Sequence, residues 1–537
     1  MAESAAPGER IDVLVIGGAF SGASVALLLR RWLPAARILV VERAPAFDRK
    51  VGEATVEVSA LFLTRVLGLF DFLARHQLPK HGLRFWFADG PERTLAEMTE
   101  IGPDEVPRLP SYQLDRSVLD EHLLATARAE GVEVARPAKV AAVELGWPES
   151  RVEIEAEDGA RRSVAARWVV DASGRHAFLA RRLRLHRRTE EHPTAALWGR
   201  WTGVADLDGP AVLGADPRRP RLPAVTPSRR LATNHFCGYG WWCWFIPLRG
   251  GETSVGVVYN KELVELPGAD PAERYRRFLE SRPGIRELLA GARLDQDDFR
   301  SYSHLPYRAE RYAGKGWALV GDAASFIDPY YSPGLDHASI SAFATARMIE
   351  DELAGRLEAA AAGAGAGDPL EAAVARHNQV FERSYGRWLH ALYVGKYELF
   401  GDAELTAAAY LVETALYYMG IVTTKDRDLE HLRYPPYGEG LWQETLFFRL
   451  MRGFTRRLTR LARRRRALGI YGRRNAGWRL LGRAPGLGAG ALHMLRSGLR
   501  IYLRVERETF LAGLRPAARR PAPEPESHRT PASLSRP

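Results

Sequence analysis

A glycine-rich turn near the N-terminus carries the residue types that bind a pyrophosphate. Residues 17–22, Gly-Gly-Ala-Phe-Ser-Gly, follow an apolar run at 11–16 and precede another at 23–29. The first run predicts a buried parallel strand and the second a helix. Such a turn directs backbone N–H groups and the positive end of the helix dipole at one point, which suits a phosphate. We therefore predict a dinucleotide site, with an ordinary tight strand–helix turn as the alternative.

Two further positions refine this prediction. Ala19 stands at the second glycine of the G-x-G-x-x-G pattern, where the backbone approaches the phosphates most closely, so its methyl group tightens the fit. Glu42 follows a second apolar run roughly 20 residues beyond the turn, where a carboxylate accepts a hydrogen bond from a ribose 2′-hydroxyl. The expected cofactor contacts in this region are Gly17, Gly18, Ala19, Ser21, Gly22, Glu42 and Arg43.

Two later turns belong to the same predicted site. Residues 171–174, Asp-Ala-Ser-Gly, and residues 321–324, Gly-Asp-Ala-Ala, each end an apolar run that predicts a buried strand. The carboxyl ends of parallel strands meet at one edge of a sheet, so both turns should lie near the same cofactor. Asp322 is then placed to bond the ribityl chain of a flavin. Each turn taken alone could be a simple strand terminus.

Cysteine content and hydropathy indicate a cytoplasmic protein. Cys237 and Cys243 are the two cysteines of the chain, which fits reduced thiols better than a disulfide framework or a metal site. The N-terminus, MAESAAPGE, lacks the apolar core of a signal peptide. The most apolar window, residues 405–423, is interrupted by Glu413, so we predict a core helix there and not a membrane span.

The net charge of +11 belongs to one segment. Residues 445–505 contain 16 arginines, no lysine and no acidic residue, whereas the rest of the chain has 60 basic and 65 acidic residues. Apolar residues lie at helical spacing among these arginines. The segment could be a helix packed on the body with a solvated basic face, or it could dock an anionic membrane surface or an acidic acyl carrier protein. Nucleic acid is not expected, because no recognition module accompanies the charge.

The ordered set of motifs resembles the flavoprotein monooxygenase superfamily. The set comprises the turn at 17–22, Glu42, Arg116, the turn at 171–174 and the turn at 321–324, and it spans residues 10–345. The resemblance implies an FAD cofactor, with Arg116 among its contacts, and an α/β fold like that of glutathione reductase and p-hydroxybenzoate hydroxylase.

This fold implies a set of domain boundaries. We expect an FAD-binding Rossmann-like domain over residues 8–345, into which an antiparallel substrate-binding sheet is inserted at about 83–108 and 190–300. A mainly helical region should follow at 346–440, with a surface loop at the alanine/glycine tract 359–367. A basic amphipathic helical segment at 441–514 and a disordered tail at 515–537 complete the expected organisation.

Three stretches resemble the flavin-dependent halogenases within that superfamily. Residues 242–247, Trp-Cys-Trp-Phe-Ile-Pro, match the family's WxWxIP pattern, whose aromatic cluster is thought to obstruct direct hydroxylation by the flavin. Residues 51–55, with Gly52, are similar to the family's segment beside the flavin. Residues 326–334 resemble the FxxPxxSxG loop that lines the flavin and the halide. The resemblance assigns Pro329, Gly334 and Leu335 to the cofactor and Ser332, Gly334 and Leu335 to the halide.

The halide assignment meets one departure from the family pattern. In halogenases the halide is held by the backbone N–H groups of the two residues after the loop serine. Here the first of these is Pro333, which has no N–H to donate. Gly334 and Leu335 could still supply amides at the start of the following helix.

The same resemblance assigns a catalytic lysine. In these enzymes FAD reduced by a separate reductase, oxygen and halide yield hypohalous acid, which a lysine either hydrogen-bonds or takes up as a haloamine. Lys80 is the match, because residues 79–85, Pro-Lys-His-Gly-Leu-Arg-Phe, resemble the family's lysine, glycine and aromatic strand. Lys50 is a competitor near the flavin segment, and a solvated lysine at a turn is the alternative for Lys80.

We therefore predict an FAD-dependent halogenase of secondary metabolism. It would halogenate an electron-rich aromatic or conjugated small molecule, which a carrier protein could tether. The alternatives are an FAD-dependent monooxygenase or oxidoreductase without halide use, and a non-catalytic flavoprotein that binds a carrier protein or membrane. The predicted location is cytoplasmic, with a peripheral position at the inner membrane face if the arginine segment binds lipid.

Overall fold

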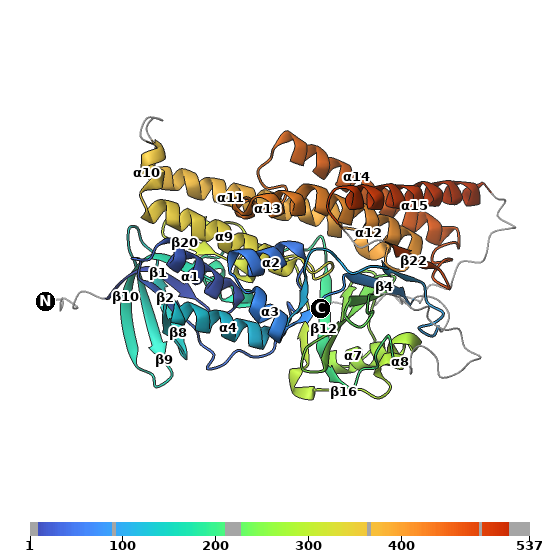
Figure 1. The fold of residues 1–537 in the computed structure, drawn as a ribbon, viewed down its shortest axis with the longest axis horizontal. Helices are drawn as coiled ribbons and strands as arrows, with labels where there is room; N and C mark the ends of the chain where they lie inside the picture. Colours follow the sequence, from blue (N-terminus) through green and yellow to red (C-terminus); the bar gives the residue numbers. More distant parts are fainter. Residues whose placement is uncertain (1–8, 89–92, 210–226, 362–366, 483–485, 515–537) are drawn as a thin grey trace, which may run out of the picture.

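The protein consists of two sheet-based units and a set of C-terminal helices that lie across both (Figure 1). The computed structural model describes residues 9–88, 93–209, 227–361, 367–482 and 486–514. The N-terminal eight residues and the tail from residue 515, predicted to be disordered, lie outside the described residues.

The first sheet is the one predicted for the dinucleotide site. Its strands follow the order β19-β20-β10-β1-β2-β7, and β20, β10, β1, β2 and β7 run parallel to one another. β2 and residues 13–16 of β1 are apolar and buried, and α1, which contacts both α4 and α9, covers the sheet. The bounds are β1 Glu9–Ile16, α1 Phe20–Trp32, β2 Ile38–Val41, α4 Arg116–Ala129, β7 Glu133–Ala135, β10 Arg161–Asp171, β19 Ala313–Gly314, β20 Trp317–Leu319 and α9 Gly334–Leu353.

Shorter elements connect this sheet to the rest of the chain. A hairpin of β8 and β9 extends from β10, and two small sheets lie outside the main ones. Their bounds, with those of the neighbouring short helices, are α2 Glu57–Leu61, α3 Phe70–His76, β3 Leu78–Pro79, β6 Tyr112–Gln113, β8 Ala138–Glu144, β9 Ser150–Ala156, α5 Phe178–Arg182, β11 His186–Arg188, β18 Tyr307–Ala309 and β21 Ser325–Phe326.

The second sheet contains the segments expected at 83–108 and 190–300. Most of its strand pairs are antiparallel, but β13 pairs with β4, and β22 with β5, in parallel, so the sheet is mixed and not purely antiparallel. Helices α7 and α8 lie against it (Figure 1). The bounds are β4 Leu83–Phe87, β5 Glu100–Pro103, β12 Thr194–Thr202, β13 Thr233–Gly238, β14 Trp241–Pro247, β15 Glu252–Asn260, α7 Pro271–Glu280, α8 Pro283–Leu289, β16 Arg293–Leu294, β17 Arg300–Tyr302 and β22 Arg479–Gly482.

Alternation along β14 places its aromatic residues on two faces. Trp242 and Trp244 belong to the core shared with the C-terminal helices, whereas Trp241 and Cys243 belong to the core under α7 and α8. Cys237 pairs in register with Trp242 and joins the first of these cores. Both cysteines are buried, and no disulfide joins them.

The C-terminal region is helical with one exception. The segment 441–514, predicted to be helical throughout, contains β22, which extends the second sheet. The alanine tract predicted as a loop begins inside α10, because alanine favours helix, and its residues 362–366 lie outside the described residues. The bounds are α10 Arg356–Ala361, α11 Pro369–Trp388, α12 Ala403–Tyr417, α13 Thr423–Arg427, α14 Trp442–Ala467 and α15 Ala489–Gly513.

The most apolar helical stretch lies inside the protein. Among the described residues, only Ala403–Arg427 is long and apolar enough to cross a membrane, with a mean hydropathy of 1.3. Its window is 67% buried against the second sheet and α15. Glu413 within it pairs with the buried Lys396. This agrees with the core helix predicted at 405–423.

Candidate active site

The three predicted turns meet at the carboxyl edge of the first sheet. Gly17 has φ of +96°, and a Cβ there would lie 2.7 Å from the carbonyl oxygen of Ala172. Gly321 has φ of +59°, and a Cβ there would lie 2.4 Å from Ser21 Oγ. Only glycine fits these two positions, because a side chain would collide with the neighbouring turn. The glycine turn therefore contacts both later turns directly.

The glycine turn presents the start of α1 to this edge. A Cβ at Gly22 would lie 1.9 Å from the Gly17 carbonyl oxygen, so the turn closes tightly on the helix. Ala19 precedes the helix without a side-chain cap, which leaves the first amides of α1 for other acceptors. One of them, Phe20 N–H, donates to Asp120 at 3.2 Å. The Glu42 carboxylate accepts hydrogen bonds from the amides of Gly18 (2.7 Å) and Ala44 (2.8 Å), which holds it beside the turn.

A basic cluster adjoins the start of α1. Arg116 and Lys50 each lie 3.1 Å from the Asp120 carboxylate. A Cβ at Gly52 would lie 2.5 Å from Arg116 Nη1, so Gly52 also belongs to this cluster. The structure thus brings Gly52 and Arg116 to the predicted cofactor edge, while Lys50 is engaged in an ion pair there. Arg43 follows Glu42 with an exposed side chain.

Asp322 lies in the turn after β20. Burial raises the pKa of its carboxyl group, and Arg175, Arg116 and Lys50 oppose this effect. Tyr307 donates to the backbone carbonyl of Asp322 at 2.6 Å, which fixes the turn. These features together fit FAD. They are the amides at the helix N-terminus, a carboxylate beside the turn, glycines that leave no room for side chains, and nearby guanidinium groups.

Lys80 lines a cavity of about 890 Å³ that is partly open to solvent. Its side chain is buried, and Nζ donates to the Thr55 carbonyl oxygen at 2.7 Å. Burial lowers the pKa of Lys80 to about 8, although Glu57 and Asp336 oppose the shift. Lys80 is therefore not the solvated lysine of the alternative interpretation. Lys50 is not among the residues that line this cavity.

The same cavity is lined by the loop predicted to contact flavin and halide. Tyr331 and Pro333 line it, together with tyrosines of the C-terminal helices and acidic residues of α2, α9 and α12. A second cavity of about 770 Å³ is lined by Asp322 and Gly334 and shares Pro333 with the first. The structure thus brings Lys80 and the loop together. The polar and aromatic residues of the Lys80 cavity include Glu57, Ser111, Asp336, Trp388, Tyr393, Tyr410, Glu413, Tyr417 and Tyr418.

The loop adopts a strained backbone. Tyr331 and Ser332 have φ of +71° and +58°, a left-handed conformation that costs non-glycine residues of order 1–3 kcal/mol each. Asp328 holds the loop in place. Its carboxylate contacts His192 at 2.8 Å and accepts a bond from the Tyr397 hydroxyl at 2.8 Å.

Few backbone amides in the loop remain for a halide. The Ser332 amide donates to the Pro329 carbonyl at 2.9 Å, and Pro333 has none. The amides of Gly334 and Leu335 open α9, where no side chain caps them.

Acidic residues from distant elements surround the cavity, and the sequence did not reveal them as part of the site. Burial raises the pKa of Asp336 to about 6; its carboxylate accepts bonds from the Ser59 amide (2.8 Å) and the Tyr417 hydroxyl (2.9 Å). Glu57 accepts a bond from the Tyr418 hydroxyl. Glu413 was visible as an acid within an apolar run, which is a signal for a buried polar role.

The tryptophans of the WxWxIP pattern lie behind the loop. The ring of Trp242 is 5.4 Å from that of Tyr330, and its Nε1–H donates to the Tyr397 hydroxyl at 3.0 Å. The ring of Trp244 lies 5.7 Å from that of Trp242 in a tilted arrangement, and its Nε1–H donates to the Ser254 hydroxyl at 3.1 Å. The pattern therefore supports the loop from the second sheet.

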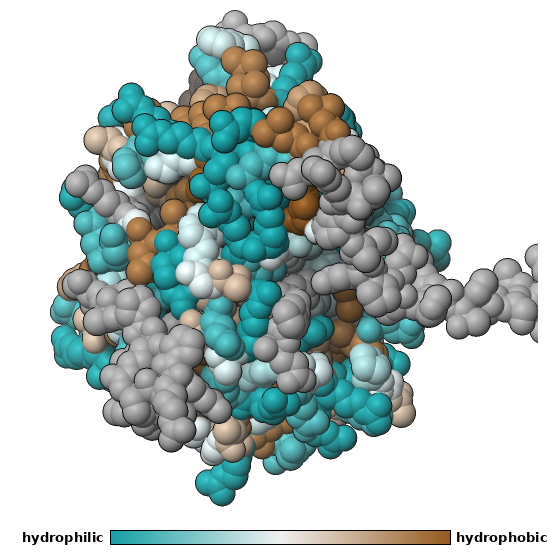
Figure 2. Space-filling model, turned by 90° about the vertical axis from the view of Figure 1, so that its right-hand side faces the viewer, coloured by the Kyte–Doolittle hydropathy of each residue, from teal (hydrophilic) through white to brown (hydrophobic). Residues whose placement is uncertain are grey.

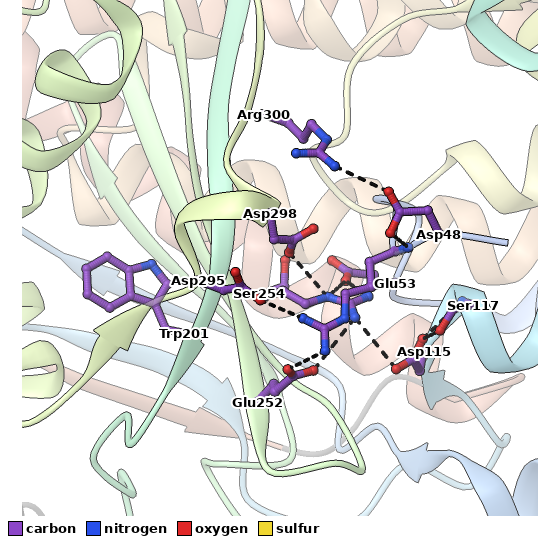
Figure 3. A network of polar contacts seen from close by, with 12 residues as sticks. Asp48, Glu53, Asp115, Ser117, Trp201, Glu252, Ser254, Asp295, Asp298 and Arg300 are labelled. Carbon is purple, nitrogen blue, oxygen red and sulfur yellow. Dashed lines mark hydrogen bonds and ion pairs between the residues drawn. The ribbon is translucent and has the colours of Figure 1, made fainter. Parts of the chain in front are cut away.

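A buried ion-pair network joins the two sheet units near the flavin segment (Figure 3). Arg200 of β12 lies 2.8 Å from Glu53, and both side chains are buried. Asp115, Glu252 and Asp298 surround the same guanidinium at 3.6 to 3.8 Å. The network fixes the segment that carries Gly52 against the second sheet.

Comparisons with known proteins agree with this geometry. A family model described as FAD binding domain matches residues 10–361. Flavin-dependent halogenase armH3 of Armillaria mellea is 27% identical over 441 residues, which cover 79% of this chain and 79% of that protein. Tryptophan 2-halogenase of Chondromyces crocatus is 28% identical over 373 residues, 65% of this chain and 63% of that protein. Halogenase PltM, solved with phloroglucinol and FAD, shares the fold with a TM-score of 0.67 at 19% identity, over 93% of this chain and 96% of that one.

The chain therefore belongs to the FAD-binding domain family, with the α/β fold expected from the motifs. Within that family it groups with the flavin-dependent halogenases, and it is an FAD-dependent enzyme. The predicted resemblance and the predicted FAD cofactor are confirmed.

Proposed function

We propose that the enzyme halogenates an electron-rich aromatic or conjugated small molecule in the Lys80 cavity. The observation that supports this most directly is a buried lysine of lowered pKa in a cavity that it shares with the flavin loop. When bound, FAD reduced by a separate reductase activates oxygen so that a halide ion is oxidised to hypohalous acid. In this proposal Gly17, Gly22, Glu42, Arg116 and Asp322 hold the cofactor.

In this proposal Lys80 delivers the halogen. Its Nζ donates one hydrogen to the Thr55 carbonyl, which orients the group and leaves its remaining hydrogens for hypohalous acid. The aromatic substrate loses a ring proton, the carbon–halogen bond forms, and the oxygen of hypohalous acid leaves as water. The surrounding tyrosines exclude bulk water and offer ring faces and hydroxyl groups to an aromatic substrate.

The halide would use the amides of Gly334 and Leu335 beside Ser332. A monooxygenase without halide use is the second candidate, because the Ser332 amide is already engaged and Pro333 has none. The observation that favours halogenation over this candidate is Lys80 itself, since hydroxylation by a flavin needs no lysine.

Mass spectrometry of substrate pools separates these functions. The protein is incubated with reduced FAD, oxygen, phenolic and indolic compounds, and either bromide or chloride. We expect products whose mass shift and isotope pattern follow the halide supplied, and none without halide. Products that gain only an oxygen atom would support the monooxygenase. No product together with no flavin oxidation would support the non-catalytic flavoprotein.

We further propose that the basic segment at 445–505 docks an anionic partner, either an acidic carrier protein or an anionic membrane. Several of its arginines are instead part of the fold. Arg465 is buried and pairs with Asp402 and Glu404, and Arg463 makes two hydrogen bonds with Glu398. The arginines that pair with carboxylates are Arg457, Arg463, Arg465, Arg473, Arg474, Arg479 and Arg504. In this proposal the arginines of the segment outside this set would contact the anionic partner.

A further inference from the structure

Helices α14 and α15 expose large apolar side chains beside unpaired arginines. Trp442 of α14 is 71% exposed, and Leu450 of the same helix is 60% exposed. Leu503 and Leu514 of the α15 region are 63% and 65% exposed. Figure 2 shows apolar residues gathered at the top of the molecule, where α14 and α15 lie in Figure 1. Exposed clusters of this kind mark interaction surfaces.

These residues form a stripe along each helix. On α15 the exposed positions 492, 496, 499, 503, 507 and 510 follow one another at intervals of three or four, which places them on one face, and Leu514 directly follows the helix. We call the two stripes together the ridge. Its apolar members are Trp442, Leu446, Phe447, Leu450, Leu492, Leu499, Leu503, Phe510, Leu511 and Leu514.

The ridge carries positive charge that nothing in the described part of the chain neutralises. Its exposed arginines are Arg449, Arg456, Arg460, Arg496, Arg500 and Arg507. Among the described residues none of these six has a carboxylate within ion-pair distance, whereas the acidic residues of α15, Glu506 and Glu508, pair with Arg457 and Arg473. The ridge is therefore cationic as well as apolar.

The two helices lie side by side and parallel. Arg457 of α14 pairs with Glu506 of α15, and the ring of Phe454 lies 5.4 Å from that of Tyr502. The 26 residues of α14 and 25 of α15 span on the order of 38 Å each. A long, straight ridge built from two helices suits an extended surface better than a small folded partner.

We propose that the ridge binds an anionic lipid bilayer surface. Leucine, phenylalanine and tryptophan enter the boundary between headgroups and acyl chains, while the arginines extend to the lipid phosphates. A tryptophan at the end of such a helix matches the preference of that residue for the membrane interface. This proposal rests on the docking role proposed above for residues 445–505 and specifies a lipid surface as the partner. It does not depend on the halogenation chemistry.

The test is co-sedimentation of the full-length protein with vesicles of 70% phosphatidylcholine and 30% phosphatidylglycerol. We expect binding at low salt that weakens steeply between 0.1 and 1 M salt, as the Debye length falls from about 10 to about 3 Å. The triple change Arg496→Gln, Arg500→Gln and Arg507→Gln should reduce the partition coefficient on the order of a hundredfold. Vesicles of phosphatidylcholine alone should bind much more weakly.

Matched variants distinguish an effect of the ridge on vesicle binding from an effect of net charge. The triple change Arg75→Gln, Arg276→Gln and Arg286→Gln removes the same charge from exposed positions of α3, α7 and α8, and it should leave binding unchanged. The change Trp442→Ser with Leu450→Ser should also reduce binding, because charge alone does not hold the ridge in the interface. All variants should halogenate a soluble substrate at the wild-type rate, so a failure here is distinct from a failure of the proposed enzyme activity.

Three results would overturn the proposal. The first is no sedimentation with anionic vesicles at low salt. The second is sedimentation that the ridge variants and the control variant reduce equally. The third is that the ridge variants abolish capture of an acidic carrier protein, or self-association of the chain in light scattering, while vesicle binding is unaffected.

Discussion

The two halves of the active site, the strand-end turns of the first sheet and the Lys80 cavity, differ in the atoms that line them. At the turns, backbone amides and glycines face the cofactor edge, and any added Cβ at Gly17, Gly22 or Gly321 meets a neighbouring atom within 2.7 Å. The Lys80 cavity is lined instead by long side chains from β3–β4, α2, α9 and α12. A cofactor site built from backbone atoms and glycines tolerates little sequence variation. Substitutions among the side chains that line a cavity can instead change which substrate binds without changing the fold.

We expect the largest effect from Gly22→Val, which tests the strand-end turns. Its side chain would enter the contact with the Gly17 carbonyl, so we expect FAD binding to be abolished, measured as flavin absorbance after purification. Gly386→Val is the matched control, because this helical glycine has no atom within 4 Å of the added Cβ. A Gly22→Val protein that purifies fully loaded with FAD would show that the cofactor lies elsewhere.

The contact between the two sheet units can be broken at Arg200. Removing this buried guanidinium in Arg200→Met leaves the buried Glu53 without its counter-charge, which should lower the free energy of unfolding by about 3 kcal/mol. Arg161→Met, which removes an exposed ion pair with Glu155, should cost less than about 1 kcal/mol. Urea denaturation of both variants measures the difference, and equal costs would mean that the network does not hold the two sheets together.

The buried charge of Lys80 should lower the free energy of unfolding of the protein. Its folded pKa of about 8 lies below the unfolded value of 10.5, so at neutral pH the fold must keep a charge that burial disfavours. Lys80→Met should therefore stabilise the protein on the order of 1–2 kcal/mol at pH 7, less than the full shift because the Thr55 carbonyl loses its donor.

The pH dependence of that gain has a definite sign. Between pH 8 and 10.5 the folded state has released the proton while the unfolded state keeps it, so wild-type stability rises. In urea titrations the advantage of Lys80→Met should shrink across this window and change little below pH 8. A gain that is constant from pH 7 to 10.5 would contradict the buried charge.

The two halves also differ in how far the sequence predicts them. The turns at 17–22, 171–174 and 321–324 could be predicted and brought to one edge because strand, turn and helix patterns are local and parallel strands end together. Lys80 could be found through its segment alone. Asp336 and Tyr417 could not, because Asp336 lies beyond the loop motif that ends at Gly334 and Tyr417 belongs to α12, which carries no motif.

The arginine segment shows the same limit. Its charge and helical spacing were apparent from the sequence, but which arginines are structural was not. Arg465 and Arg496 look alike in the sequence, yet the first is buried between Asp402 and Glu404 and the second is exposed on the ridge. The strand β22 was missed because a four-residue partner of β5 carries too short a pattern to separate it from a loop.

The division of labour between the halves is the central claim, and one paired measurement tests it: halogenated product and reduced-FAD oxidation followed together in Lys80→Ala. We predict that product falls about a hundredfold or more while flavin oxidation stays within about twofold of wild type, and that Lys80→Arg behaves alike, because a guanidinium does not readily form a haloamine. Lys425→Met is the matched control, since Lys425 is also buried with a pKa lowered to about 8 but does not line the cavity, and it should keep both activities. Wild-type product yield from Lys80→Ala, or loss of flavin oxidation together with product in that variant alone, would contradict the account.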